Sequence, residues 1–153
     1  MQESIFDAFP EAEFRVAIVW IDIMDSDTPA TALSASVELG DGRASYFHDP
    51  THHAGRALAR SLDWQRHVPW DAYLFYAPGQ RWDGEAPPPP SEWFHALQDR
   101  EVWEETLAAE GAEGTGWTEH LAEESEADPE RFRRDRALTV ALRDAGTEWL
   151  ARS

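Results

Sequence analysis

The histidines of this 153-residue chain cluster where they could bind a metal ion. His48, Asp49, His52 and His53 lie within six residues, and imidazole with carboxylate is a ligand set that zinc, iron and nickel accept. His48 and His52 are four residues apart, a spacing that places two side chains on one helix face. Pro50 opposes a helix that starts at His48, because the residue before a proline is pushed out of the helical region.

Acidic residues after an expected strand could complete this site. Residues 16–21 are a continuous apolar run, typical of a strand buried on both faces. Asp22, Asp25 and Asp27 follow that run. Ligands of parallel α/β sheets bind at the carboxyl ends of the strands, so these acids and the histidines are expected at the same edge. The predicted metal ligands are His48, His52, Asp25 and Asp27.

A simpler interpretation of the same residues is structural. Asp27 or Thr28 can cap a helix that has Pro29 near its first position. Asp49 and Pro50 can form a turn, which leaves the histidines exposed at the start of the next helix. Both interpretations stay open at the level of the sequence.

Aromatic residues gather in and around a third expected strand, residues 71–76. Trp70, Tyr73, Trp82 and Trp93 could line a groove that takes a peptide, a partner protein or a small ligand. The alternative is that these side chains pack the core and cover a hairpin. These four residues are therefore the predicted binding residues if they line a groove rather than pack the core.

Apolar periodicity alternates between strand and helix along the chain. The expected order is β-α-β-α-β-β-α followed by a helical extension, which predicts an α/β fold with a mostly parallel central sheet. Residues 30, 33 and 37 mark one face of the first helix. The expected strands are residues 14–24, 44–47, 71–76 and a short hairpin partner at 81–82, and the expected helices begin near residues 28, 51, 91 and 128.

Four segments of the chain are similar to segments of a known family: VAIVWIDIMDSD (residues 16–27), YFHDPTHHAGRALARSL (46–62), PWDAYLFYAPGQRW (69–82) and PPPPSEWFHALQ (87–98). They resemble thioredoxin-like proteins of the redoxin type, mostly uncharacterised bacterial sequences. The resemblance implies a three-layer α/β/α domain over residues 1–100, which lacks the first βα unit, and makes Pro69 the candidate for the cis-proline that precedes the third strand in that family. The residues that follow, 101–153, are expected to form an acidic helical extension.

The redox motif of that family is missing from this sequence. A Cys-x-x-Cys normally opens the first helix of such domains, whereas this chain has no cysteine, and residues 1–10 would match only the tail of that helix. The absence of cysteine excludes thiol–disulfide exchange, disulfide bonds, thiolate zinc sites and iron–sulfur clusters. Two explanations stay open: the gene has lost its redox half, or the true start lies upstream.

Charge excludes further classes of partner. Thirty acids and thirteen arginines, with no lysine, give a net charge of −17. Such a surface repels phosphate backbones, so nucleic acid is not an expected partner. No apolar stretch spans a bilayer and residues 1–10 show no signal peptide, so we expect a cytoplasmic protein without a membrane partner. Acid excess with arginine alone indicates a cytoplasm at high salt.

The sequence therefore favours a redox-inactive, cysteine-free thioredoxin-like protein that binds another protein or a small ligand, with no cofactor. One alternative is a metal-dependent enzyme that uses the Asp/His edge of the sheet. Another is a homodimer, because a sheet without its first strand exposes an edge that can pair with a second copy.

Overall fold

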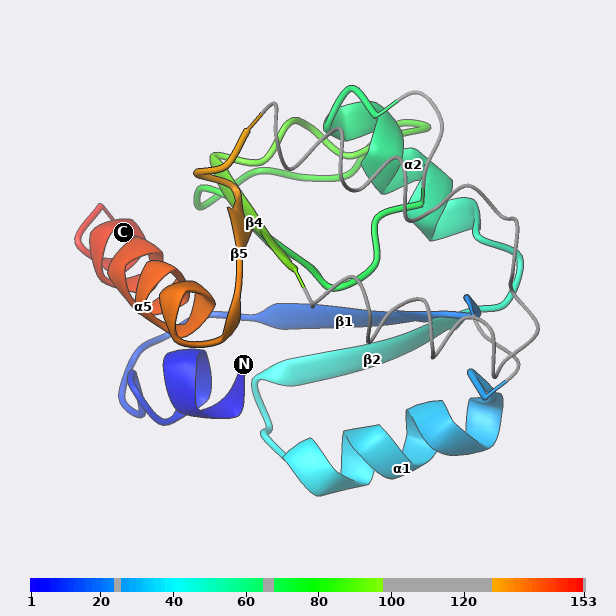
Figure 1. The fold of residues 1–153 in the computed structure, drawn as a ribbon, viewed down its shortest axis with the longest axis horizontal. Helices are drawn as coiled ribbons and strands as arrows, with labels where there is room; N and C mark the ends of the chain where they lie inside the picture. The colour runs from blue at the N-terminus through cyan, green and yellow to red at the C-terminus, as the bar shows by residue number, and fades with distance from the viewer. Residues whose placement is uncertain (24–25, 65–67, 98–127, 153) are drawn as a thin grey trace.

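Two small β-sheets frame the molecule, and helices pack around them (Figure 1). The computed structural model describes residues 1–23, 26–64, 68–97 and 128–152. Its mixed α/β architecture agrees with the expected fold class. In chain order the elements are a π-helical turn η1 (Gln2–Phe6), β1 (Val16–Ile21), α1 (Pro29–Leu39), β2 (Ala44–Asp49), α2 (His53–Ser61), β3 (Ala72–Phe75), β4 (Glu92–Ala96), β5 (Phe132–Arg133) and α5 (Asp135–Leu150).

The β1–α1–β2 unit forms as the sequence predicts. β1 and β2 pair in parallel over their full lengths. Thr28 caps α1 in a reciprocal capping box with Thr31, and Pro29 lies in the first turn. Gly40 ends the helix with a φ of 55°, a left-handed conformation that glycine adopts without strain. Local signals therefore decide this part of the fold.

The start of α2 packs against β1 at Gly55, where no side chain fits. A Cβ at Gly55 would lie 2.3 Å from Cγ1 of Val68 and 3.0 Å from Cδ1 of Ile21. We expect Gly55→Ala to lower the free energy of unfolding by about 1–3 kcal/mol, because overpacking forces neighbouring side chains off their rotamers. Urea unfolding followed by tryptophan fluorescence measures this loss. Gly42→Ala is the matched control, since its Cβ would meet nothing within 4 Å, and an equal loss in both variants would contradict the prediction.

The second sheet corrects two sequence predictions. β3 pairs antiparallel with β4, and β4 pairs in parallel with β5. Residues 81–82 are not a hairpin partner, and residues 92–96 form β4 rather than the helix expected after Ser91. The physical reason is a period of two in the side chains of β4, because Trp93 and His95 share one face while Glu92 and Phe94 share the other.

The expected single, mostly parallel sheet is not what the described residues form. β1 and β2 make one sheet, and β3, β4 and β5 make the other. The peptide bond before Pro69 is trans, as are the other peptide bonds in the described ranges. The predicted domain boundary near residue 100, and the extension up to residue 127, lie outside the described residues.

An aromatic core fills one side of the second sheet. Trp64 stacks on Phe132 with ring centroids 6.1 Å apart, and it meets Trp93 edge-on at 5.6 Å. Ala59 brings α2 into the same cluster. His95 is fully buried here, with its ring 5.1 Å from that of Phe132. The core therefore depends on one face of β4.

His95 is the polar member of this aromatic core. Neither of its ring nitrogens has a hydrogen-bond partner among the described residues. Burial lowers the pKa of His95 to about 4, because a charged ring in an apolar surrounding loses its hydration. The side chain is therefore neutral near pH 7. Its two ring nitrogens are buried without hydrogen bonds to described residues, which lowers the stability of the fold.

α5 covers the opposite face of the second sheet and also contacts the N-terminal turn (Figure 1). Leu142 is 1% exposed on the inner side of α5. Gly146 allows close contact with Phe9, whose ring would lie 2.7 Å from a Cβ at that position. Arg43 donates to the carbonyl oxygens of Phe6 at 3.1 Å and Phe9 at 2.7 Å. These contacts hold the N-terminal turn between β2 and α5.

Candidate functional site

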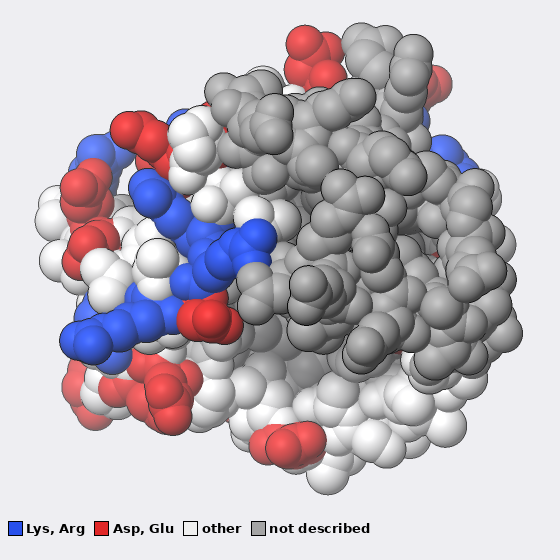
Figure 2. All heavy atoms as spheres, viewed as in Figure 1, with Lys and Arg blue, Asp and Glu red and all other residues white. Residues whose placement is uncertain are grey.

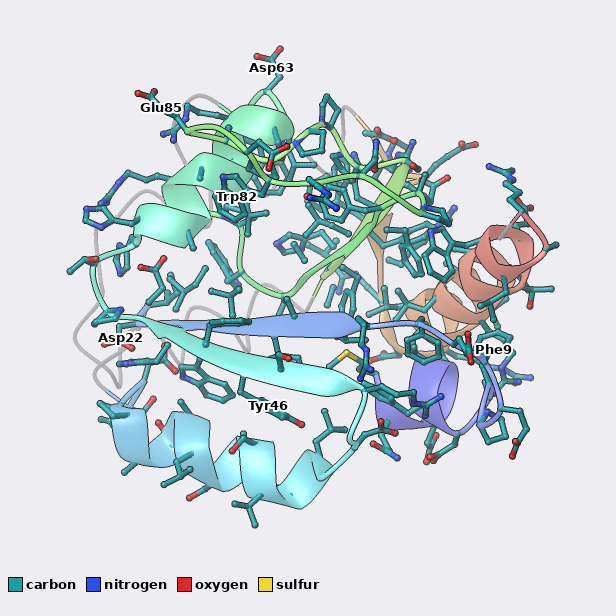
Figure 3. The ribbon with its side chains drawn as sticks, turned by 180° about the vertical axis from the view of Figure 1, so that it is seen from behind. Phe9, Asp22, Tyr46, Asp63, Trp82 and Glu85 are labelled. Carbon is teal, nitrogen blue, oxygen red and sulfur yellow. The ribbon has the colours of Figure 1, made fainter. Side chains whose placement is uncertain are left out.

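The carboxyl ends of β1 and β2 bring one acid and two imidazoles together. Oδ1 of Asp22 lies 2.6 Å from Nε2 of His48, and the carbonyl oxygen of Asp22 lies 2.5 Å from Nε2 of His52. His52 reaches it from a left-handed backbone conformation with a φ of 58°. Figure 3 shows Asp22 at this end of the first sheet. We call Asp22, His48 and His52 the acid–imidazole edge.

Asp49, the last residue of β2, has a structural role. It is 8% exposed, and its two carboxylate oxygens accept hydrogen bonds from the N–H groups of His53 at 2.9 Å and Gly55 at 3.0 Å. Asp49 therefore satisfies two of the free N–H groups in the first turn of α2. The ring of His53 lies 3.2 Å from the hydroxyl of Thr51. Neither Asp49 nor His53 joins the acid–imidazole edge.

Two acids from different segments, Asp27 after β1 and Asp71 before β3, interact electrostatically. Asp27 accepts a hydrogen bond from the N–H of Ile23 at 2.9 Å. Desolvation, and then the negative charge of Asp27, raise the pKa of Asp71. Desolvation and the charge of Asp71 likewise raise the pKa of Tyr73. A raised pKa brings the proton exchange of a carboxyl group closer to neutral pH, which is what a general acid or base requires.

The predicted metal ligands are not gathered into one set. His48 and His52 both turn toward Asp22, while Asp27 accepts from the main chain. Asp25 lies outside the described residues. In the part of the chain that the structure describes, no group of three or more His, Asp or Glu side chains is placed to hold a metal ion. A metal site at this edge stays a prediction.

The predicted aromatic binding residues fall in three places. Trp70 and Trp93 pack against the core. Tyr73 lies on β3, opposite Phe94 of β4. Trp82 is 47% exposed and lines an open groove of about 640 Å³ along α2 (Figure 3). The structure therefore does not bring these four side chains into one groove.

A different groove, of about 670 Å³, lies between the outer face of the second sheet and α5. We call it the sheet–helix groove. Phe75 and Phe94 contribute apolar surface from the strands, and Val140 and Trp149 contribute it from the helix. The indole Nε1–H of Trp149 donates to the carbonyl oxygen of Tyr76 at 2.7 Å, which fixes one end of the groove. Sequence reasoning missed this site, because only a strand at residues 92–96 turns Phe94 toward α5.

Charged side chains of both signs line the sheet–helix groove. The acids are Glu92, Asp144 and Glu148, and the last of these pairs with Arg152 at 3.2 Å. Arg133 and Arg136 line the groove too, and Figure 2 shows arginine side chains gathered over β5 and the first turn of α5. Neither of these two guanidinium groups forms an ion pair with a described residue. Nε of Arg133 is buried and has no hydrogen-bond partner within the described ranges. Arg131, by contrast, pairs with Glu92.

The two arginines lie close to the N-terminus of α5, and repulsion between these positive groups destabilises the protein when no anion is bound. The N-cap residue of α5, Arg134, makes no side-chain capping hydrogen bond within the described structure, so the first turn presents the positive end of the helix dipole. Arg133 and Arg136 add like charge at the same point, and Asp135 in the first turn offsets part of it. A bound anion would be attracted by the helix end and by both guanidinium groups.

No family model, curated protein or solved structure matches this chain. None of the helices within the described residues is long and apolar enough to cross a lipid bilayer. Function must therefore be inferred from the chemistry of the acid–imidazole edge and the sheet–helix groove.

Proposed function

We propose that this chain is a binding module without thiol chemistry that takes an amphiphilic anion into the sheet–helix groove. The observation that carries the proposal is the pair of guanidinium groups, on Arg133 and Arg136, without ion-pair partners among the described residues at the end of an apolar groove. The ligand has an apolar body, which contacts Phe94 and Val140, and an acidic head group, which binds the two arginines.

Three arginines among the described residues, Arg43, Arg131 and Arg152, pair with carboxylates. Arg15, Arg56 and Arg60 donate to main-chain carbonyl oxygens instead. Arg43 pairs with Asp41 at 2.8 Å, and Arg131 pairs with Glu92. Arg133 and Arg136 lack such partners in the described structure, although the sequence contains thirty acids. A guanidinium group presents a planar fork of N–H donors that matches a carboxylate or phosphate. The groove therefore offers recognition of a head group as well as apolar surface.

We also propose that the scaffold is thioredoxin-like and that it works in a cytoplasm at high salt. The succession β1–α1–β2–α2–β3–β4 supports this relationship, since its first strand pair is parallel and its last is antiparallel. The division into two sheets weighs against it. The net charge of −17 and the absence of lysine support a salt-rich environment, which would screen the repulsion between acids.

Titration with decanoate tests the proposed function. We expect decanoate to bind the protein in calorimetry at high salt. Decanol has the same chain length but no charge, and we expect it to bind at least about tenfold more weakly, because a hydrogen bond to a charged group contributes about 1.5–3 kcal/mol. Equal affinity for the two ligands would reject recognition of the head group.

Removal of both groove arginines should abolish this preference. In the double variant Arg133→Ala, Arg136→Ala we expect decanoate to bind about tenfold or more weakly, with decanol unaffected. Arg143→Ala is the matched control, because Arg143 belongs to the same helix but does not line the groove. A loss of equal size in the control would assign the effect to overall charge rather than to the site.

The acid–imidazole edge supports a second candidate function, an enzyme that transfers protons or uses a metal ion. The observation in its favour is the contact of Asp22 with both imidazoles, Oδ1 lying 2.6 Å from Nε2 of His48 and the carbonyl oxygen 2.5 Å from Nε2 of His52. Zinc titration separates the two functions, because imidazole ligands lie at this edge and not among the residues that line the sheet–helix groove. Saturable zinc binding that decanoate leaves unchanged would favour the edge.

A further inference from the structure

The outward face of α1 is apolar and uncovered. Leu33 is 65% exposed and Val37 is 74% exposed, and none of the residues of α1 is buried. The helix lies against β2 at the border of the molecule, on the far side of the first sheet from the second sheet (Figure 1). The residues with the lower exposure, which turn toward the protein, are Ala32, Ala35, Ser36 and Leu39.

This orientation reverses what the side-chain sizes suggest. A surface helix usually buries its larger apolar residues and exposes its polar ones. Here Leu33 and Val37, four positions apart on one face, point outward. Contiguous exposed apolar patches mark contact surfaces. The stripe formed by Leu33 and Val37 is therefore a candidate contact surface.

The low charge of α1 limits the choice of occupant. Charged residues are 28% of the chain, yet Glu38 is the only charged residue among the eleven of α1. An acidic or basic partner would find almost nothing here to pair with. A second copy of this chain carries a net charge of −17 and is repelled by most of the surface. The α1 stripe is a surface where two copies can touch without placing acids against acids.

We propose that α1 is a self-association surface, at which two copies pack antiparallel across a two-fold axis. Leu33 and Val37 of one copy then meet the same residues of the other, as an isologous contact requires. β2, against which α1 packs, pairs only with β1 among the described residues, so this side of the molecule carries no further described strand. This inference does not depend on the ligand of the sheet–helix groove.

The salt dependence of association is the first test. Repulsion between two strongly acidic copies falls as salt shortens the Debye length, from about 10 Å at 0.1 M to about 3 Å at 1 M. We expect light scattering with size-exclusion chromatography to show monomer at low salt and dimer at high salt. An interface built on ion pairs would give the opposite trend. A mass that stays monomeric across the salt series would overturn the proposal.

Substitution on the stripe is the second test. Val37→Glu places two carboxylates across the two-fold axis, and we expect it to keep the protein monomeric at high salt. Val140→Glu is the matched control, because Val140 is also an exposed valine, 50% exposed against 74% for Val37, but lies in the sheet–helix groove. It should preserve the dimer and weaken decanoate binding, whereas Val37→Glu should do the reverse.

Circular dichroism establishes that each variant is folded, and Leu33→Glu provides a second position on the stripe. Dimer formation that survives both Val37→Glu and Leu33→Glu would overturn the proposal. Loss of the dimer in Val140→Glu as well would also overturn it, because association would then follow total charge. Failure of decanoate to bind any variant would reject the proposed function alone and leave the dimer standing.

Discussion

Lowering the pH from 6.5 to 4 is expected to reduce the free energy of unfolding by about 3 kcal/mol through one side chain, His95. In the folded protein burial lowers the pKa of His95 to about 4, against an ordinary value of 6.5. Between pH 6.5 and 4, His95 is therefore mostly protonated in the unfolded chain and mostly neutral in the folded protein. The contribution of His95 is complete above pH 6.5 and is lost as the pH falls toward 4.

His95→Phe isolates this effect. The variant replaces an imidazole without hydrogen-bond partners in the described structure by an apolar ring, so we expect it to be at least as stable as the wild type near neutral pH and to lose less stability on acidification. Urea unfolding at several pH values measures both slopes. Asp71 acts in the opposite direction in both proteins, because its pKa is raised. Identical slopes in variant and wild type would contradict the assignment to His95, and His95→Leu repeats the test with a smaller side chain.

Leu142→Ala is expected to lower the free energy of unfolding by about 2–5 kcal/mol, the largest loss we expect from a single substitution. Leu142 is 1% exposed, and α5, which carries it, packs on β4 and on the N-terminal turn. Removal of three side-chain carbons leaves a cavity between these elements. Chemical unfolding at high salt measures the loss.

Val140→Ala provides the control for this substitution. Val140 is two positions away on α5 but is 50% exposed, so its truncation should change stability by no more than about 0.5 kcal/mol. Losses of similar size at the two positions would mean that α5 is not docked through Leu142. The comparison also tests the orientation of α5, on which the sheet–helix groove depends.

The first part of the fold could be predicted because its signals are local. The apolar run of residues 16–21, the Thr28 cap and Gly40 determine β1 and α1 without reference to distant residues. β4 could not be predicted in this way, because adjacent Trp93 and Phe94 suit a helix as well as a strand. Pairing with β3 and β5 decides between them, and β5 lies about forty positions further along the chain.

The candidate sites show the same limit. The sequence placed His48 and His52 near acids at a strand end, but the acid that both contact is Asp22, which directly follows β1. The sheet–helix groove has no local pattern, because its residues come from strands and a helix that meet only in the folded chain. One signal was available: four arginines within residues 131–136, at the start of a helix, on a chain with an excess of acids.

β4 separates the sheet–helix groove from the aromatic core. Phe94 lies on the face of the strand toward the groove, and Trp93 lies on the face toward the core. Because the two faces belong to one strand, we expect a ligand that binds in the groove to change the packing of the aromatic core. Trp93 and its neighbour Trp64 are therefore natural optical probes, and a shift in indole emission on adding a candidate molecule would report occupancy without any attached dye.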